Sequence, residues 1–149
     1  MARLDYESFL SGLPDAVVGV DEAFRIILWN SAAEALTGKS ARRVQARILK
    51  EVLAPDSSLA RHLSETLRTG ESRSEAEAMI EGADGRPIPV SIVTAPITGR
   101  SGSVEAAVAV LRDLSRIRQL EEEVRRGETL ATAGRMAVGL AHEIRNPLG

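Results

Sequence analysis

The residue types best suited to group transfer lie near the end of the chain, where His142 is followed directly by Glu143 and, one turn later, by Asn146. A neutral imidazole is a nucleophile near physiological pH. Pro147 removes a backbone N–H and crowds the carbonyl of Glu143, so we expect the helix to loosen or bend just beyond the histidine. An imidazole with a carboxylate beside it and a weak point after it predicts a site where a group moves on and off the ring.

The residues before the histidine predict the helix that positions it. Apolar side chains recur at alternating spacings of three and four, a pattern typical of helices that pack into a dimeric bundle. These seam residues are Leu130, Ala133, Ala137, Leu140 and Ile144. His142 falls between the last two, so it is expected to point away from the seam towards solvent. A zinc site of the H-E-x-x-H type is excluded, because Asn146 stands where the second imidazole would have to be.

Length and composition set broad limits on function. With 149 residues, 44% of them apolar, the chain suits one domain and an appendage. With a net charge of −2, the chain lacks the excess of Lys and Arg that is typical of nucleic-acid-binding proteins. The absence of cysteine excludes disulfides and thiolate metal sites. The N-terminus is too polar for a signal peptide, and no stretch is apolar for long enough to span a membrane. We therefore expect a cytoplasmic chain.

The first half of the chain predicts a hairpin followed by helices. Residues 3–12 form a short amphipathic helix, and apolar, β-branched runs then indicate two strands at residues 16–20 and 25–29. Ser31 and Glu34 have the spacing of a capping box, so Ser31 is expected to cap a helix that ends at Gly38. Short helical turns are expected over residues 39–55, and a longer helix from Ser57 or Ser58 to Gly70.

Three further strands are predicted after this helix. Residues 73–81 are mostly polar and suit a sheet edge, whereas residues 104–111 are apolar on both faces and suit a central strand. Asp84-Gly85 indicates a hairpin turn between the first two of these strands. Pro87 and Pro89 are expected to delay regular pairing until Val90. Two strands, several helices and three strands make an antiparallel α+β domain.

This order of elements resembles a PAS sensory domain, a five-stranded antiparallel sheet with flanking helices. The resemblance is carried by the run IILWNSAAEALTG at residues 26–38, where a strand ends in W-N and feeds a helix, and by Asp113-Leu114-Ser115, which matches the family's D-x-[ST] ending. It covers about residues 13–115, after the N-terminal helix of residues 1–12.

The sequence HEIRNPL, which begins at His142, resembles the phospho-acceptor box of sensor histidine kinases of the nitrogen-regulation type. The resemblance implies that His142 accepts a phosphoryl group from ATP and passes it to an aspartate of a response regulator. It further implies that Glu143 is the general base and that Asn146 orients a water for dephosphorylating the regulator. The implied partners are a second copy of the chain, a response-regulator receiver domain and the kinase's ATP-binding domain.

The chain ends at Gly149 within the motif's helix, and no nucleotide lid or P-loop is present in it. We therefore expect ATP to be bound by a domain outside this sequence, and we do not expect the fragment to phosphorylate itself. The rival interpretation is a PAS dimerisation or ligand-binding module without phosphoryl chemistry.

Residues 116–132 predict a coiled-coil signalling helix, and residues 133–149 the start of the dimerisation and phosphotransfer domain. Ile117, Leu120 and Val124 keep heptad spacing, but the later seam is displaced by one residue near Gly127. Our hypothesis is that sensor-domain motion becomes helix rotation at this slip. A mild packing fault at a glycine explains the pattern equally well.

The ligand of the sensor region is open. PAS domains hold haem, flavin, small organic anions or nothing. A flavin–thiol adduct would require cysteine, and the aromatic side chains that could stack on a large cofactor are few, namely Tyr6, Phe9, Phe24 and Trp29. His62 lies on the helix of Leu59 and Leu63, and the corresponding position in oxygen-sensing PAS domains makes it a candidate haem ligand. A surface or edge histidine is the commoner occupant of such a position.

Overall fold

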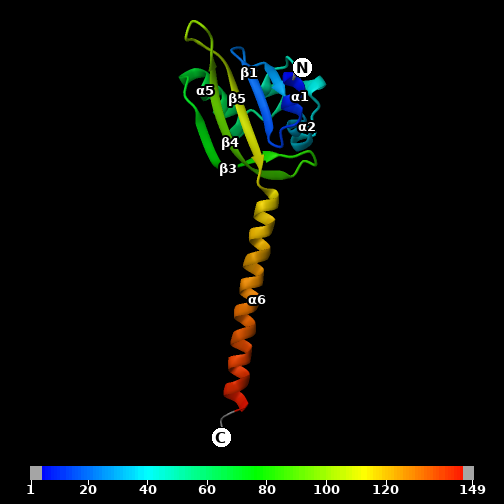
Figure 1. Cartoon of the computed structure of the whole chain (residues 1–149), viewed down its shortest axis with the longest axis vertical. Helices are drawn as coiled ribbons and strands as arrows, with labels where there is room; N and C mark the ends of the chain where they lie inside the picture. The colour runs from blue at the N-terminus through cyan, green and yellow to red at the C-terminus, as the bar shows by residue number, and fades with distance from the viewer. Residues whose placement is uncertain (1–4, 146–149) are drawn as a thin grey trace. The chain divides into compact units, whose positions relative to one another are not determined.

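The structure is a computed structural model that describes the backbone of residues 5–145 and the side chains of residues 5–138. The described chain divides into two units, one ending at Leu114 and one beginning at Ser115. Figure 1 shows the helices and strands. In chain order they are α1 (Tyr6–Ser11), β1 (Ala16–Asp21), β2 (Ile26–Trp29), α2 (Ser31–Thr37), α3 (Ala41–Val44), α4 (Leu49–Val52), α5 (Ser58–Thr69), β3 (Arg73–Glu81), β4 (Pro87–Thr98), β5 (Val104–Asp113) and α6 (Ser115–Arg145).

The first unit is built on a five-stranded antiparallel sheet in the order β2-β1-β5-β4-β3. This arrangement confirms the predicted edge position of residues 73–81 and the central position of the strand that follows Ser103. The β1–β2 hairpin and the short helical turns between residues 39 and 55 are also as predicted.

Helices α2 to α5 share the core with one face of the sheet. Strand β1 is buried on both faces, and period-two alternation along β4 and β5 directs one set of apolar side chains towards these helices. The fully buried members include Val18, Ile26, Leu49, Leu59, Leu63, Val90, Ile92 and Leu111. The alternate residues lie on the other face, where Val93 is 52%, Ile97 48% and Val110 38% exposed. The sheet therefore has one packed face and one open apolar face.

The predicted capping box is wrong by one residue. Asn30, not Ser31, caps α2, because its side chain accepts a hydrogen bond from the Ala33 N–H, while Ser31 is exposed. The Glu34 carboxylate instead accepts from the Ala41 N–H at the start of α3. The end of α2 at Gly38, in left-handed conformation with φ of 71°, is as predicted. The cap of α5 is Ser57 and its end is Gly70, also as predicted.

The delay in pairing at the two prolines is also wrong. Pro87 already pairs with Glu81, and Pro89 pairs with Met79. A proline is tolerated in a strand where its missing N–H is not needed for the ladder. Pro89 meets this condition, since its carbonyl is directed away from β3 and accepts the Leu114 N–H at 2.8 Å. The ladder between β3 and β4 is interrupted further along instead, between Glu75 and Ala78.

The second unit is the single helix α6 (Figure 1). It runs from Ser115 to Arg145 and passes through Gly127 without a break. Its apolar side chains Ile117, Leu120, Val124 and Leu130 are 48%, 48%, 61% and 72% exposed. A surface helix that carries apolar residues at this spacing has a face suited to a second helix.

Candidate functional site

The predicted phospho-acceptor residues lie at the end of α6. The backbone of His142 and Glu143 is helical, which puts both residues on one regular element, but their side chains lie outside the described part of the chain. Asn146 and Pro147 also lie outside the described residues. The roles inferred for His142, Glu143 and Asn146 therefore remain predictions from the sequence.

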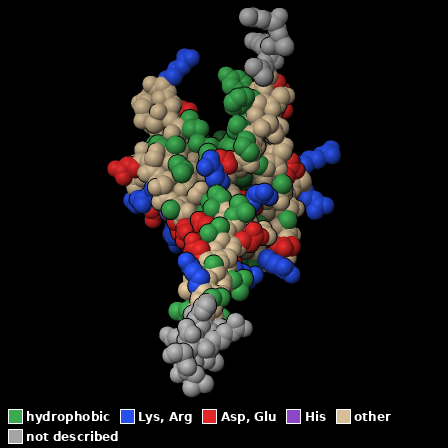
Figure 2. Space-filling model, turned by 60° about the horizontal axis from the view of Figure 1, so that its bottom comes forward, with side chains coloured by type: hydrophobic (Ala, Val, Ile, Leu, Met, Phe, Trp, Pro, Cys, Tyr) green, Lys and Arg blue, Asp and Glu red, His purple; other side chains and the backbone are tan. Residues whose placement is uncertain are grey.

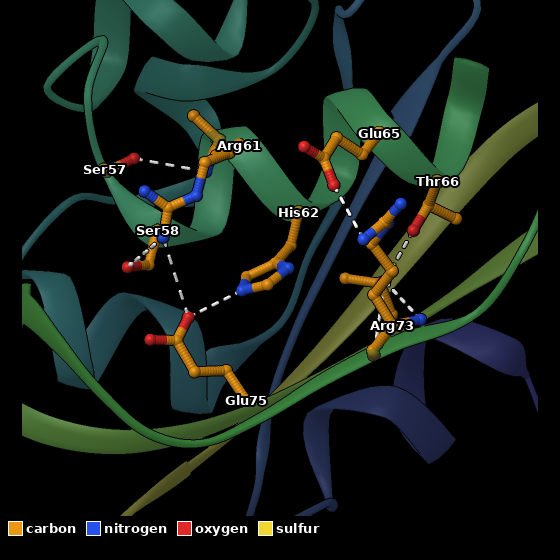
Figure 3. A network of polar contacts seen from close by, with 10 residues as sticks. Ser57, Ser58, Arg61, His62, Glu65, Thr66, Arg73 and Glu75 are labelled. Atoms are coloured by element: carbon orange, nitrogen blue, oxygen red, sulfur yellow. Dashed lines mark hydrogen bonds and ion pairs between the residues drawn. The ribbon is translucent and has the colours of Figure 1, made fainter. Parts of the chain in front are cut away.

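The other histidine, His62, belongs to a polar network between α5 and β3 (Figure 3). Its Nε2 lies 2.6 Å from Oε2 of Glu75, and Nη2 of Arg61 lies 3.9 Å from the same carboxylate oxygen. His62 Nδ1 is buried and has no hydrogen-bond partner among the described residues. Because Nε2 already holds Glu75, His62 could bind a haem iron through Nε2 only if this contact broke.

A second group of polar contacts lies between α5 and strands β3 and β4 (Figure 3). Arg73 Nη1 lies 2.9 Å from Oε2 of Glu65, and the hydroxyl groups of Thr66 and Thr94 are 2.6 Å apart and fully buried. These contacts tie α5 to β3 and β4 by side chains as well as by apolar packing. The only sign of these contacts in the sequence is the presence of polar residues on an otherwise apolar helix face.

A cleft of about 460 Å³ opens between the end of α2, the loop between α4 and α5, and the turn between β3 and β4. Val52, Leu53 and Leu59 supply part of its apolar wall. Its charged lining residues are Lys39, Asp56 and Glu81, and Ser57 and Ser58 lie beside them. The chemistry of this lining suits a small polar molecule. Sequence reasoning missed the cleft, because its walls come from three segments far apart in the chain.

Two glycines shape the wall of this cleft. Gly38 adopts a φ of 71°, and a Cβ atom built there would lie 2.9 Å from the Cβ of Ala83. A Cβ at Gly82 would lie 2.3 Å from Cδ1 of Ile88. The absence of a side chain at Gly38 therefore lets Ala83 of the β3–β4 turn lie against the end of α2, and the absence of one at Gly82 leaves room for Ile88 within the same hairpin.

Trp29 is a core residue. It is 6% exposed, and its Nε1 donates a hydrogen bond to the Lys39 carbonyl at 2.9 Å. A buried indole needs such a partner. Its neighbour Asn30 is also buried and connects α1, β1 and α2, so the W-N pair in the PAS-like run organises the fold.

Charged side chains of both signs are interspersed over the face shown in Figure 2.

Within the described residues, no group of three or more His, Asp or Glu side chains is arranged to hold a metal ion. None of the helices in the described range is both long enough and apolar enough to cross a membrane.

Residues 4–114 match the family model of the PAS fold, and the chain belongs to this family. Among solved structures, it is similar to the PAS domain of nitrogen regulation protein NR(II) from Vibrio parahaemolyticus. The two are 26% identical with a TM-score of 0.60, over 75% of this chain and 99% of that one. The PAS interpretation and the fold predicted from the sequence are thus confirmed.

The curated relatives are sensor kinases. The chain is 28% identical to the sensory histidine kinase/phosphatase NtrB of Vibrio alginolyticus over 142 residues, which is 95% of this chain and 40% of that protein. It is 31% identical to the sensor protein kinase FleS of Pseudomonas aeruginosa, over 95% of this chain and 30% of that protein. The chain thus spans less than half the length of these relatives. Since the NtrB alignment is longer than residues 4–114, it extends into the α6 unit.

Proposed function

We propose that this chain is the sensory and phospho-acceptor region of a two-component histidine kinase. The observation that carries the proposal is the order of parts: a PAS domain, then a helix with exposed apolar residues, then His142 in the sequence HEIRNPL on that helix. The kinase relatives support it, because their similarity covers both units. In this proposal the PAS domain receives a signal and α6 relays it to His142.

The proposed chemistry is phosphoryl transfer in two steps. A ring nitrogen of His142 attacks the γ-phosphorus of ATP, so that a P–N bond forms while the P–O bond to ADP breaks and ADP leaves. Glu143 takes the proton from the other ring nitrogen. An aspartate oxygen of the response regulator then attacks the same phosphorus, and the P–N bond breaks. Asn146 is assigned the placement of the water that later hydrolyses the aspartyl phosphate. ATP is held by a kinase domain that this chain does not supply.

The test uses the chain's own second histidine as a control. The chain contains two histidines, His62 and His142. Incubation of the full-length kinase with γ-labelled ATP should give an acid-labile, alkali-stable label that is lost in His142→Gln and kept in His62→Gln. A label that survives His142→Gln would refute the proposal.

A second candidate function is a small-molecule sensor without phosphoryl chemistry, which the cleft lined by Lys39, Asp56 and Glu81 favours. We expect a small polar ligand there or none. Haem is the weaker alternative, since the contact between His62 and Glu75 would have to break. Normal phosphotransfer to a response regulator would favour the first candidate over this one.

We further propose that the chain acts as a homodimer. The open apolar face of the sheet, with Val93, Ile97 and Val110, and the exposed seam of α6 each present apolar side chains to solvent. Burial of both in a dimer would remove this area from water.

A further inference from the structure

The apolar stripe at the start of α6 determines a heptad register. Ile117, Leu120 and Val124 are separated by three and four residues and are 48%, 48% and 61% exposed. Only one assignment fits this spacing, with Ile117 and Val124 at position a and Leu120 at position d. The assignment fixes every other position of the first two heptads.

The positions beside the seam carry charges in a definite pattern. Arg116 and Glu123 fall at position g, and Glu121 and Glu128 fall at position e. Both e-position glutamates border the same shallow apolar surface as the three seam residues. In a parallel, in-register pair of helices, each g residue faces the e residue five positions later on the other helix. Arg116 would therefore face Glu121 of the second copy, and Glu123 would face Glu128 of the second copy.

These two contacts differ in sign. The first joins opposite charges, and the second brings two carboxylates together. The nearby arginines do not neutralise the second contact, because Arg125 binds Oε2 of Glu122 and Arg126 Nε lies 3.7 Å from Oε1 of the same residue. Within the described part of α6, Glu123 and Glu128 have no ion pair.

The seam itself is also weak at this point. The next d position is Gly127, where a built Cβ would meet nothing within 4 Å. The heptad from Glu123 to Thr129 therefore contributes neither an apolar side chain at d nor an attractive pair at its edge. The preceding heptad contributes both.

In the proposed dimer, α6 lies parallel to α6 of a second copy. We propose that the first two heptads of this helix pair have opposite electrostatic character. The pair is held together around Arg116 and Glu121 and is pushed apart around Glu123 and Glu128. The second heptad is the place where the two helices separate or rotate with least resistance. This inference rests on the proposed dimer and adds to it a device for regulating the helix pair.

The test is the same substitution at equivalent positions one heptad apart, Glu121→Lys and Glu128→Lys, made in the 149-residue chain. Glu121→Lys converts two symmetric attractions into repulsions and should weaken the dimer. Glu128→Lys does the reverse and should tighten it. We expect changes of about 5-fold in the dissociation constant, in opposite directions, at about 0.1 M salt. Both changes should shrink at about 1 M salt, where the Debye length falls to about 3 Å. Analytical ultracentrifugation measures each constant.

Two controls separate the pairing from the net charge. Glu22→Lys changes the charge equally at an exposed site in the β1–β2 turn and should leave the constant unchanged. The double variant Arg116→Glu/Glu121→Lys restores opposite charges and should recover the affinity lost in Glu121→Lys. Shifts of the same sign in Glu121→Lys and Glu128→Lys, or no shift in either, would overturn the inference. Labelling of His142 in the full-length kinase is measured separately, so a failure here is distinguishable from a failure of the proposed function.

Discussion

Asn30 and Val17 are joined by two hydrogen bonds: the Val17 N–H donates to the Asn30 side-chain Oδ1 at 2.9 Å, and the Asn30 N–H donates to the Val17 carbonyl at 3.2 Å. The same Oδ1 accepts the Ala33 N–H, and the Asn30 Nδ2 donates to the carbonyls of Leu10 and Asp15. Asn30 is 5% exposed, so one buried side chain connects the end of α1, the start of β1 and the start of α2.

We expect Asn30→Ala to lower the free energy of unfolding by about 3 kcal/mol, because it leaves the buried Val17 N–H without a partner and removes the cap of α2. Ser31→Ala is the matched control, since Ser31 is exposed at the adjacent position, and it should change the stability by less than about 0.5 kcal/mol. Urea unfolding of both variants measures the difference. If Ser31→Ala lowered the free energy of unfolding as much as Asn30→Ala, Ser31 and not Asn30 alone would cap the helix.

His62 should act as a structural link between α5 and β3. Because its Nε2 contacts Glu75 at 2.6 Å, we expect His62→Ala to lower the free energy of unfolding by about 1 kcal/mol. Glu75→Gln keeps a hydrogen-bonding group and should cost less. On addition of haem, the wild-type chain and His62→Ala should give the same absorption spectrum. A Soret band that depends on His62 would show instead that the histidine leaves Glu75 to bind iron.

The open face of the sheet should contribute to self-association. Val93 lies on β4, is 52% exposed and pairs with Val110 of β5 across the ladder, so Val93→Glu places a charge in the middle of this face. We expect the dimer to weaken at least 10-fold while the unfolding free energy changes little. Ala23→Glu, at an exposed site in the β1–β2 turn, is the control. Unchanged association of Val93→Glu would place the dimer contact elsewhere.

Gly127 and Gly134 allow the hypothesis of a register slip to be separated from simple helix stiffening. Neither position has an atom within 4 Å of a built Cβ, so Gly127→Ala and Gly134→Ala should each stabilise α6 by about 1 kcal/mol. Only Gly127 lies where the two seams change register. Under the proposed function, Gly127→Ala should therefore alter signal-dependent phosphorylation in the full-length kinase more than Gly134→Ala. Equal effects of the two substitutions on phosphorylation would mean that the register shift at Gly127 is only a packing fault with no role in signalling.

The sequence predicted the features that depend on local patterns. Gly38 and Gly70 ended their helices as expected, because a left-handed residue after an apolar helix is a local signal. The capping-box pattern predicts Ser31 as the cap because it takes account only of spacing along the chain and not of tertiary contacts. Asn30 caps the helix because its side chain also satisfies Val17, a residue thirteen positions earlier.

Features assembled from distant segments could not be predicted. The contact between His62 and Glu75 depends on how α5 lies against β3, and the cleft beside Lys39 depends on the approach of Ala83 to Gly38 at the end of α2. The pairing of Pro89 with Met79 could not be predicted for a similar reason. The effect of Pro89 on pairing depends on which neighbouring strand its main-chain groups face, and only the sheet order decides that.

The helix α6 should also respond to acid through Glu122. The hydrogen bond from Arg125, more than the charge of Arg126, lowers the pKa of Glu122 below its ordinary value. A carboxyl group with a lowered pKa stabilises the folded helix above its ordinary pKa of about 4.3, and this contribution is lost as the pH falls through the lowered value. Glu122→Gln should therefore reduce helicity around residue 122 at neutral pH, and the difference from the wild-type chain should vanish in acid. Cα chemical shifts of residues 118–126 measure it at concentrations where the chain is monomeric. A difference that stays constant across this pH range would contradict the assignment, since it would not come from the ionised carboxylate.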